Sequence, residues 1–295
     1  MNKIEILKSE KDGLKVKADI HRMAKEGWES ISEDDIQRLK WYGLFLRNPT
    51  PGFFMLRVRI PNGFSFSHQI RALCFIAETF GNGIIDITTR QQVQLRQLKI
   101  ENVPEVFDLL EEAGLTSTQT GLDNVRNIIG CPVAGLNPKE RVNPYAQVKA
   151  LTEHILNNSE FSNLPRKFNV AISGCMSDCV HAETQDLALV PAVQEKGGNR
   201  VYGFNVLVGG KLGSGGYRIA TSLDVFISPE EVVEVCSAII LLYRDHGSRG
   251  ARNKNRLAFL IEDWGEEKFR KALEERLGKA LSSGGVDLRE NEKTS

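Results

Sequence analysis

The order of strands and helices expected between residues 53 and 114 most constrains the fold of this chain. Apolar and basic side chains alternate from Leu56 to Ile60, which is typical of a half-buried strand. The expected elements are a strand at 53–60, a helix at 68–80, strands at 84–88 and 93–100, and a helix from Pro104 to Gly114. This β-α-β-β-α order is typical of the split βαβ, ferredoxin-like unit, a name that refers to the fold and implies no iron.

The flanking segments extend this unit into an α+β chain. Residues 1–46 read as polar amphipathic helices, and Pro49 and Pro51 mark a boundary after them. After Gly121 a helix and several strands are expected, the first of them at 168–173. The resulting division is a helical segment at 1–46, a ferredoxin-like half-domain at 47–119, a mixed α/β repeat at 120–282 and a flexible tail at 283–295.

Composition excludes several classes of function. Lys and Arg together number 38 in the 295 residues, as do Asp and Glu, so no global charge attracts nucleic acid or an anionic membrane. No apolar run is long enough to span a bilayer, and the N-terminus has no signal-peptide pattern, so we expect a cytoplasmic protein. The five cysteines are too few and too irregular for a disulfide framework.

Three segments carry cationic and polar groups where core residues are expected: 86–96 with Arg90, 123–127 with Arg126, and 164–169 with Lys167. A single arginine is more often part of a solvated face or a surface ion pair. Convergence of all three would instead suit a polyanionic cofactor with a small anionic substrate. The basic run at 249–256 is either a solvated face or a patch for an acidic partner.

The cysteines offer a possible metal or cluster site. Cys175 and Cys179 form a C-x3-C pair after a strand, and Cys131 is the clearest third ligand. Zinc and iron–sulfur clusters need four ligands, and His181 is a possible fourth, although a lone histidine is more often structural. The two remaining cysteines, Cys74 and Cys236, fall on apolar helix faces and are expected in the core.

Several segments, in order along nearly the whole chain, carry a resemblance to one family. They include GLKVKADIHRMAKEG, FFMLRVRIPNG, DITTRQQVQLR, GLTSTQTGLDNVRNIIGCPVAG, NLPRKFNVAISG and YGFNVLVGG. These segments resemble the siroheme-dependent nitrite and sulfite reductases, specifically the ferredoxin-dependent assimilatory nitrite reductases. The resemblance implies a ferredoxin-like half-domain followed by one mixed α/β siroheme/4Fe-4S repeat. It also implies siroheme and a 4Fe-4S cluster as cofactors, and ferredoxin or a similar protein as the electron donor.

The resemblance assigns roles to individual residues. Arg90, Arg126 and Lys167 correspond to cations that surround siroheme and hold nitrite, and Gln94 and Arg96 to contacts with siroheme carboxylates. Asn169 would orient the substrate or water. Sulfite reductases typically carry a second lysine at the position of Asn169, so asparagine favours nitrite, which has the smaller negative charge.

The cysteines depart from the family pattern. Family members are longer, and their second half carries the C-x5-C and C-x3-C motifs that bind the cluster and the siroheme iron. Cys131, Cys175 and Cys179 form an incomplete set, because Val125 stands where a C-x5-C partner of Cys131 would be. We therefore expect most of the cluster ligands outside this chain.

Four functions stay open at this point. The favoured one is the N-terminal half of a nitrite reductase that makes ammonia with ferredoxin electrons once joined to a missing C-terminal half. The others are half of a sulfite reductase, a siroheme-binding fragment without catalysis, and a pair of copies whose cysteines share one centre. No nucleic acid or membrane partner is expected in any of them.

Overall fold

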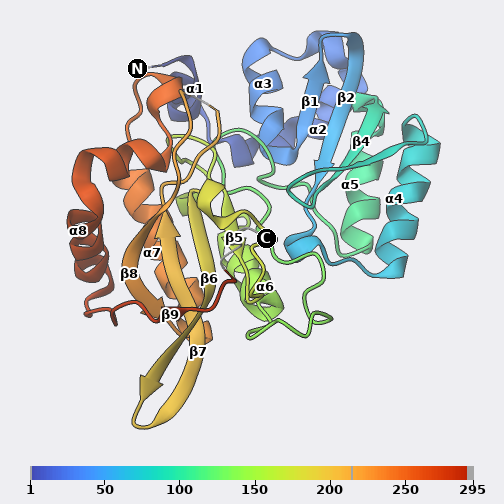
Figure 1. Cartoon of the computed structure of the whole chain (residues 1–295). Helices are drawn as coiled ribbons and strands as arrows, with labels where there is room; N and C mark the ends of the chain where they lie inside the picture. Colours follow the sequence, from blue (N-terminus) through green and yellow to red (C-terminus); the bar gives the residue numbers. More distant parts are fainter. Residues whose placement is uncertain (1, 214, 291–295) are drawn as a thin grey trace. The chain divides into compact units, whose positions relative to one another are not determined.

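The computed structural model describes residues 2–213 and 215–290 of the chain. These residues form two compact units. The N-terminal unit comprises Lys3–Asn127 and Leu156–Asn163, and the C-terminal unit comprises Asn2, Ile128–Ile155 and residues 164–290. Figure 1 draws the first in blue to green and the second mainly in green to red.

The N-terminal unit is built around a four-stranded sheet with the order β1-β2-β4-β3. All of its strand pairs are antiparallel. The strands are β1 (Leu44–Arg47), β2 (Thr50–Val58), β3 (Ile85–Ile87) and β4 (Val93–Leu98). The helices are α1 (Lys3–Glu10), α2 (Ile20–Glu26), α3 (Glu33–Arg38), α4 (Ser67–Phe80) and α5 (Val103–Glu112). The β-α-β-β-α order of β2, α4, β3, β4 and α5 confirms the predicted ferredoxin-like unit.

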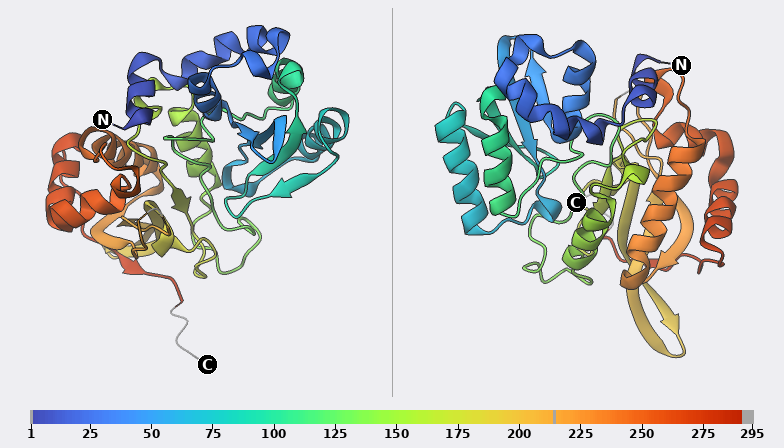
Figure 2. Two further views of the ribbon diagram at one scale, coloured as in Figure 1. Left: turned by 90° about the horizontal axis from the view of Figure 1, so that it is seen from above. Right: turned by 180° about the vertical axis from the view of Figure 1, so that it is seen from behind.

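The two faces of this sheet differ in chemistry. Leu56 and Val58 of β2 and Val93 and Leu95 of β4 are buried in the core that α4 and α5 also enter. Because side chains alternate along a strand, the residues between them point to the opposite face. That face carries Arg57, Arg59, Gln94 and Arg96. The views in Figure 2 show α4 and α5 lying side by side on one side of this sheet.

The ends and faces of helices follow the sequence pattern with two exceptions. Ser32 caps α3, because its hydroxyl accepts the Asp35 N–H at 3.1 Å. The helix α4 begins at Ser67, one residue before the predicted start at residue 68. The prediction that Cys74 lies in the core is wrong, because α4 buries Leu73, Ile76 and Ala77 and leaves Cys74 exposed.

The C-terminal unit contains a five-stranded sheet with the order β5-β6-β7-β8, and β9 pairs with β6. The β5–β6 pair is parallel and the other pairs are antiparallel. Its strands are β5 (Val170–Ile172), β6 (Leu187–Lys196), β7 (Asn199–Val208), β8 (Thr221–Ile227) and β9 (Val286–Asp287). Its helices are α6 (Tyr145–Ile155), α7 (Val232–His246) and α8 (Leu257–Leu277). These elements confirm a mixed α/β repeat after the half-domain.

Helices and a C-terminal strand complete this second unit. The middle helix α7 packs against both α6 and α8 and buries Cys236, as predicted. In the described part of the predicted tail, β9 pairs with β6 and Arg289 forms an ion pair with Glu183. Among residues 2–213 and 215–290, no helix is both long and apolar enough to cross a membrane.

Candidate functional site

Arg59 is the organising residue of the cationic face in the N-terminal unit. Its side chain is fully buried, with 1% exposure, and donates hydrogen bonds to the backbone carbonyls of Gln119 at 3.0 Å and Val125 at 2.9 Å. It also donates to the carbonyl of Arg126 at 3.0 Å. Sequence reasoning gave Arg59 no role. The sequence feature that could have identified it is its alternation with the core residues of β2, which places its side chain on the opposite face of the sheet.

Burial of this guanidinium is costly and is not offset by an acid. In the described part of the chain, no carboxylate lies within ion-pair distance of Arg59 or of its neighbour Arg57. Burial, and then the charge of Arg90, lower the pKa of Arg59 to about 9. The Nε atoms of Arg57 and Arg59 are buried and have no hydrogen-bond partner. This face therefore carries positive charge that an anion would stabilise.

The predicted anion-binding residues Arg90 and Arg126 lie at this same face. Arg126 is buried, and its guanidinium donates to the carbonyls of Thr120 and Leu122. Arg90 donates to the carbonyl of Asn127 at 2.8 Å, and the Asn127 amide donates to the Arg90 carbonyl at 3.0 Å. Two of the three predicted cationic segments, 86–96 and 123–127, are therefore joined directly.

Arg96 and Gln94, predicted to contact siroheme carboxylates, are already engaged with each other and with an acid. Arg96 forms an ion pair with Asp86 on β3 and donates to the Gln94 side-chain oxygen at 3.3 Å. A cofactor carboxylate would have to compete with Asp86 for this guanidinium. The role of both residues stays a prediction.

Lys167 and Asn169 lie in the C-terminal unit, immediately before β5. Both side chains are half-buried. The Asn169 N–H donates to the Asp186 carboxylate at 2.7 Å, and the Asn169 side-chain oxygen is a buried atom without a hydrogen-bond partner. Convergence of this third segment with the other two stays a prediction.

A buried ion pair fixes the backbone that carries Asn169. Arg256 donates through Nε and through a terminal nitrogen to the two carboxylate oxygens of Asp186, at 2.8 and 2.6 Å. Both side chains are buried to 1% exposure or less. The basic run at 249–256 is therefore not uniformly solvated, since Arg256 serves the interior of the unit.

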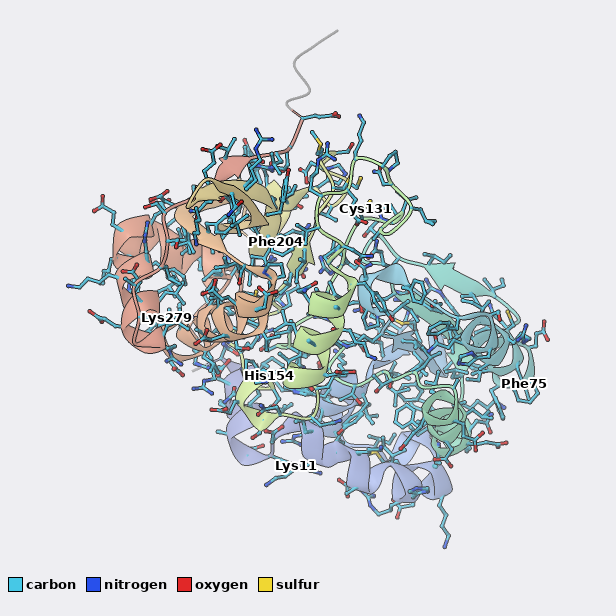
Figure 3. The ribbon with its side chains drawn as sticks, turned by 90° about the horizontal axis from the view of Figure 1, so that it is seen from below. Lys11, Phe75, Cys131, His154, Phe204 and Lys279 are labelled. Atoms are coloured by element: carbon cyan, nitrogen blue, oxygen red, sulfur yellow. The ribbon has the colours of Figure 1, made fainter. Side chains whose placement is uncertain are left out.

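The three predicted cysteine ligands come together in the C-terminal unit. The sulfurs of Cys131, Cys175 and Cys179 all lie within 4.8 Å of one another, and those of Cys131 and Cys179 are 3.7 Å apart. Cys131 and Cys175 are buried and Cys179 is exposed. Figure 3 labels Cys131 in the irregular segment that precedes α6. Among the described residues, no histidine, aspartate or glutamate joins this group, so His181 is not a fourth member.

Gly174 allows the two cysteine-bearing segments to approach. A Cβ atom on Gly174 would lie 1.5 Å from the carbonyl oxygen of Val142. The Gly174 carbonyl accepts the Arg141 N–H at 2.7 Å, and a β-bridge joins Glu140 to Cys175. The segment after Cys131 is therefore tied to the C-x3-C turn by backbone contacts.

Comparison with known proteins identifies two matching domain models. Residues 47–113 match the nitrite/sulfite reductase ferredoxin-like half domain. Residues 121–281 match the nitrite and sulphite reductase 4Fe-4S domain. The second match alone covers more than half of the chain, and the two follow each other in the predicted order.

Individual relatives agree with these matches. The ferredoxin–nitrite reductase of Leptolyngbya laminosa is 47% identical over 289 residues, which are 96% of this chain and 56% of the relative. The assimilatory ferredoxin-dependent nitrite reductase of Haloferax mediterranei is 40% identical, over 98% of this chain and 52% of the relative. The solved structure of the Mycobacterium tuberculosis NirA protein superposes with a TM-score of 0.91 at 32% identity, covering 98% of this chain and 55% of that one.

The lengths of these matches bear on the prediction that a C-terminal half is missing. The alignments cover nearly all of this chain and in themselves give that prediction no support. The chain spans about half the length of the curated relatives it matches. With both domain models matched in order, the chain belongs to the nitrite and sulphite reductase family.

Proposed function

We propose that this chain provides the anion-binding surface of a siroheme-dependent nitrite reductase, an oxidoreductase that converts nitrite to ammonia with electrons from ferredoxin. The observation that carries the proposal is the cationic face of the N-terminal unit, where Arg59 is buried and Arg57 half-buried without a carboxylate partner among the described residues. The names of the relatives, which are ferredoxin–nitrite reductases, support the substrate and the electron donor.

The residues of this face suit the cofactor that the family match supports. Siroheme carries several carboxylates, and guanidinium groups bind carboxylates through two parallel hydrogen bonds. The Nε atoms of Arg57 and Arg59 have no hydrogen-bond partner in the described part of the chain. At these atoms no bonded group offsets the free-energy cost of removing positive charge from water. When bound, siroheme supplies the iron centre at which nitrite is reduced.

The protein's own groups then bind the substrate and provide protons. We assign Arg90 and Arg126 to holding the anion and to stabilising negative charge on it during reduction. Both guanidiniums are oriented by backbone carbonyls, so the positive charge is positioned before substrate arrives. Lys167 is the proposed proton donor, because its ammonium carries a transferable proton and lies half-buried.

Asn169 is the proposed basis for preferring nitrite over sulfite. Its backbone is fixed by the Asp186 carboxylate, and its buried side-chain oxygen has no partner within the described residues. That oxygen can orient a water or a protonated substrate without adding charge. A lysine there would add a positive charge that suits the dianion sulfite better than the monoanion nitrite.

The three cysteines of this chain do not suit the 4Fe-4S cluster that also belongs to this family. A cluster needs four ligands, and the described residues bring together three thiols and no further histidine or carboxylate. We therefore place the cluster ligands in sequence other than these three cysteines. A C-terminal half is the source that fits this proposal.

Reconstitution tests the proposal. We would produce the chain in a host that makes siroheme, alone and together with the C-terminal half of a relative such as the Leptolyngbya laminosa enzyme. Siroheme absorption and nitrite reduction by reduced ferredoxin are expected only when both parts are present. Turnover by the chain alone would contradict the need for further ligands, and a stable pair without siroheme or turnover would contradict the function.

A matched pair of variants identifies the residues responsible. Arg90→Ala is expected to lower nitrite turnover about 100-fold or more, the scale of losing one charged group that stabilises a transition state. Arg47→Ala removes an exposed arginine of β1 and is expected to leave turnover unchanged. Equal effects of the two variants would contradict the assignment of Arg90.

A further inference from the structure

We propose that Cys131, Cys175 and Cys179 bind a single soft, tetrahedral metal ion such as Zn²⁺, separate from the family's four-iron cluster. The inference goes beyond the proposed nitrite reduction and does not depend on siroheme. It rests on the spacing of the three sulfurs, on the donors that surround them and on the open side of the group.

The sulfur spacing fits one ion. Four thiolates at about 2.3 Å from a tetrahedral Zn²⁺ lie ~3.8 Å from one another. The sulfurs of Cys131 and Cys179 are 3.7 Å apart, and all three lie within 4.8 Å. In a four-iron cluster each cysteine binds a different iron, so its sulfurs must lie further apart than in a single-ion site. The group is therefore too tight for the cluster.

Two hydrogen-bond donors orient the sulfur of Cys175. The Asn137 side-chain amide donates to the Cys175 sulfur at 2.9 Å, and the Ser177 backbone N–H donates to it at 3.4 Å. Hydrogen bonds of this kind orient metal ligands and adjust their basicity. Asn137 lies in the segment that follows Cys131, which the β-bridge between Glu140 and Cys175 holds in place. The same backbone contacts therefore position the cysteine ligands and Asn137, which donates a hydrogen bond to one of them.

The fourth coordination position faces solvent. Within the described residues, no histidine, aspartate or glutamate side chain completes the group. Cys179 is exposed and lines a cavity of about 470 Å³ together with Asp178 and His181. A metal site with three protein ligands keeps an open position that takes water or a small ligand. We infer that water is the fourth ligand here.

A disulfide between Cys131 and Cys179 is the alternative use of these thiols. It would leave Cys175 outside the bond, although Cys175 is the sulfur that receives both hydrogen bonds. Metal binding uses all three sulfurs, and each thiol releases its proton to solvent as the metal–sulfur bond forms. The arrangement therefore favours an ion over a disulfide.

Cobalt titration of this 295-residue chain under anaerobic, reducing conditions tests the inference. Co²⁺ substitutes for Zn²⁺ and gives thiolate charge-transfer bands and strong visible bands in a tetrahedral site. We expect these bands to saturate at one Co²⁺ per chain and to disappear when Zn²⁺ is added. Cys175→Ser is expected to abolish the bands, and Cys74→Ser, which changes an exposed cysteine outside the group, to leave them intact.

A milder variant tests the supporting hydrogen bond. Asn137→Ala is expected to keep the one-to-one stoichiometry and to weaken Zn²⁺ binding about 10–100-fold, as loss of an outer-shell partner does. Circular dichroism of each variant would show that the fold is retained.

Three results would overturn the inference. The first is reconstitution with iron and sulfide that yields a four-iron cluster ligated by these cysteines. The second is a Cys131–Cys179 disulfide in the protein purified without reductant, together with no metal binding after reduction. The third is Co²⁺ binding that Cys175→Ser and Cys74→Ser leave equally strong. None of these results bears on siroheme binding, so failure here is distinguishable from failure of the proposed function.

Discussion

Replacement of Arg59 by methionine tests how the cationic face is organised. Methionine has a similar length and fills much of the same space, but it carries neither charge nor donor. Three backbone carbonyls, those of Gln119, Val125 and Arg126, would lose a donor that lies 3.0 Å away or closer. All three belong to the segment 116–127, which also carries one of the proposed anion-binding arginines.

The expected change in global stability is small because two large effects oppose each other. Each buried carbonyl left without its donor costs about 1–3 kcal/mol. Against this, burial and then the charge of Arg90 lower the pKa of Arg59 to about 9, which corresponds to a cost of about 5 kcal/mol for keeping the guanidinium charged. The three carbonyls together cost about 3–9 kcal/mol, so we expect the free energy of unfolding to change by no more than about 4 kcal/mol.

The local change is expected to be much larger. Urea denaturation gives the global free energy, and amide hydrogen exchange gives the protection of residues 116–127. In Arg59→Met we expect these amides to lose protection while the amides of β4 keep it. Unaltered protection in 116–127, with an unaltered free energy of unfolding, would refute the view that Arg59 holds this segment.

Three further predictions concern the C-terminal unit. Arg256→Met leaves the Asp186 carboxylate buried without its partner and is expected to destabilise the chain by about 3–5 kcal/mol in urea denaturation, whereas an effect below 1 kcal/mol would contradict a buried pair. Gly174→Ala places a Cβ against the Val142 carbonyl, so we expect weaker cobalt binding and a lower melting temperature; unchanged values would show that the segments separate freely. Burial raises the pKa of Asp245, but hydrogen bonds from two arginines outweigh it and lower that pKa overall, so the stability lost in Asp245→Asn should be present at pH 7 and shrink as pH falls below about 3.8 and through the lowered pKa. A stability difference that grows as pH falls from 7 to 3 would contradict this sign.

Local patterns in the sequence predicted the elements of the fold well. The alternation from Leu56 to Ile60 and the helix boundaries at Pro104 and Gly114 depend on neighbouring residues, and the structure agrees with both. Cys74 was placed wrongly because neighbouring helix positions differ by about 100° in direction, so a small rotation of the apolar face exposes it.

Contacts between distant residues could not be predicted in the same way. The Asp186–Arg256 pair joins residues 70 positions apart, and a basic run gives no sign that one of its members is buried. Arg59 was missed because an arginine on a half-buried strand ordinarily reaches solvent, and only the fold shows that the 116–127 segment covers it. The C-x3-C pair and Cys131 predicted that the three cysteines form a group, but no sequence pattern predicts the distances between their sulfur atoms.

Titration with free siroheme of this chain, paired with the C-terminal half of a relative, tests the central claim most directly. Binding would be followed by the absorption spectrum, for the wild type, an Arg90→Ala/Lys167→Ala double variant and an Arg47→Ala control. Two lost charge-assisted contacts at about 1.5–3 kcal/mol each predict at least about 100-fold weaker binding by the double variant. The control should bind as the wild type does. Equal affinity of the double variant and the wild type would contradict the claim that these cations form the binding surface.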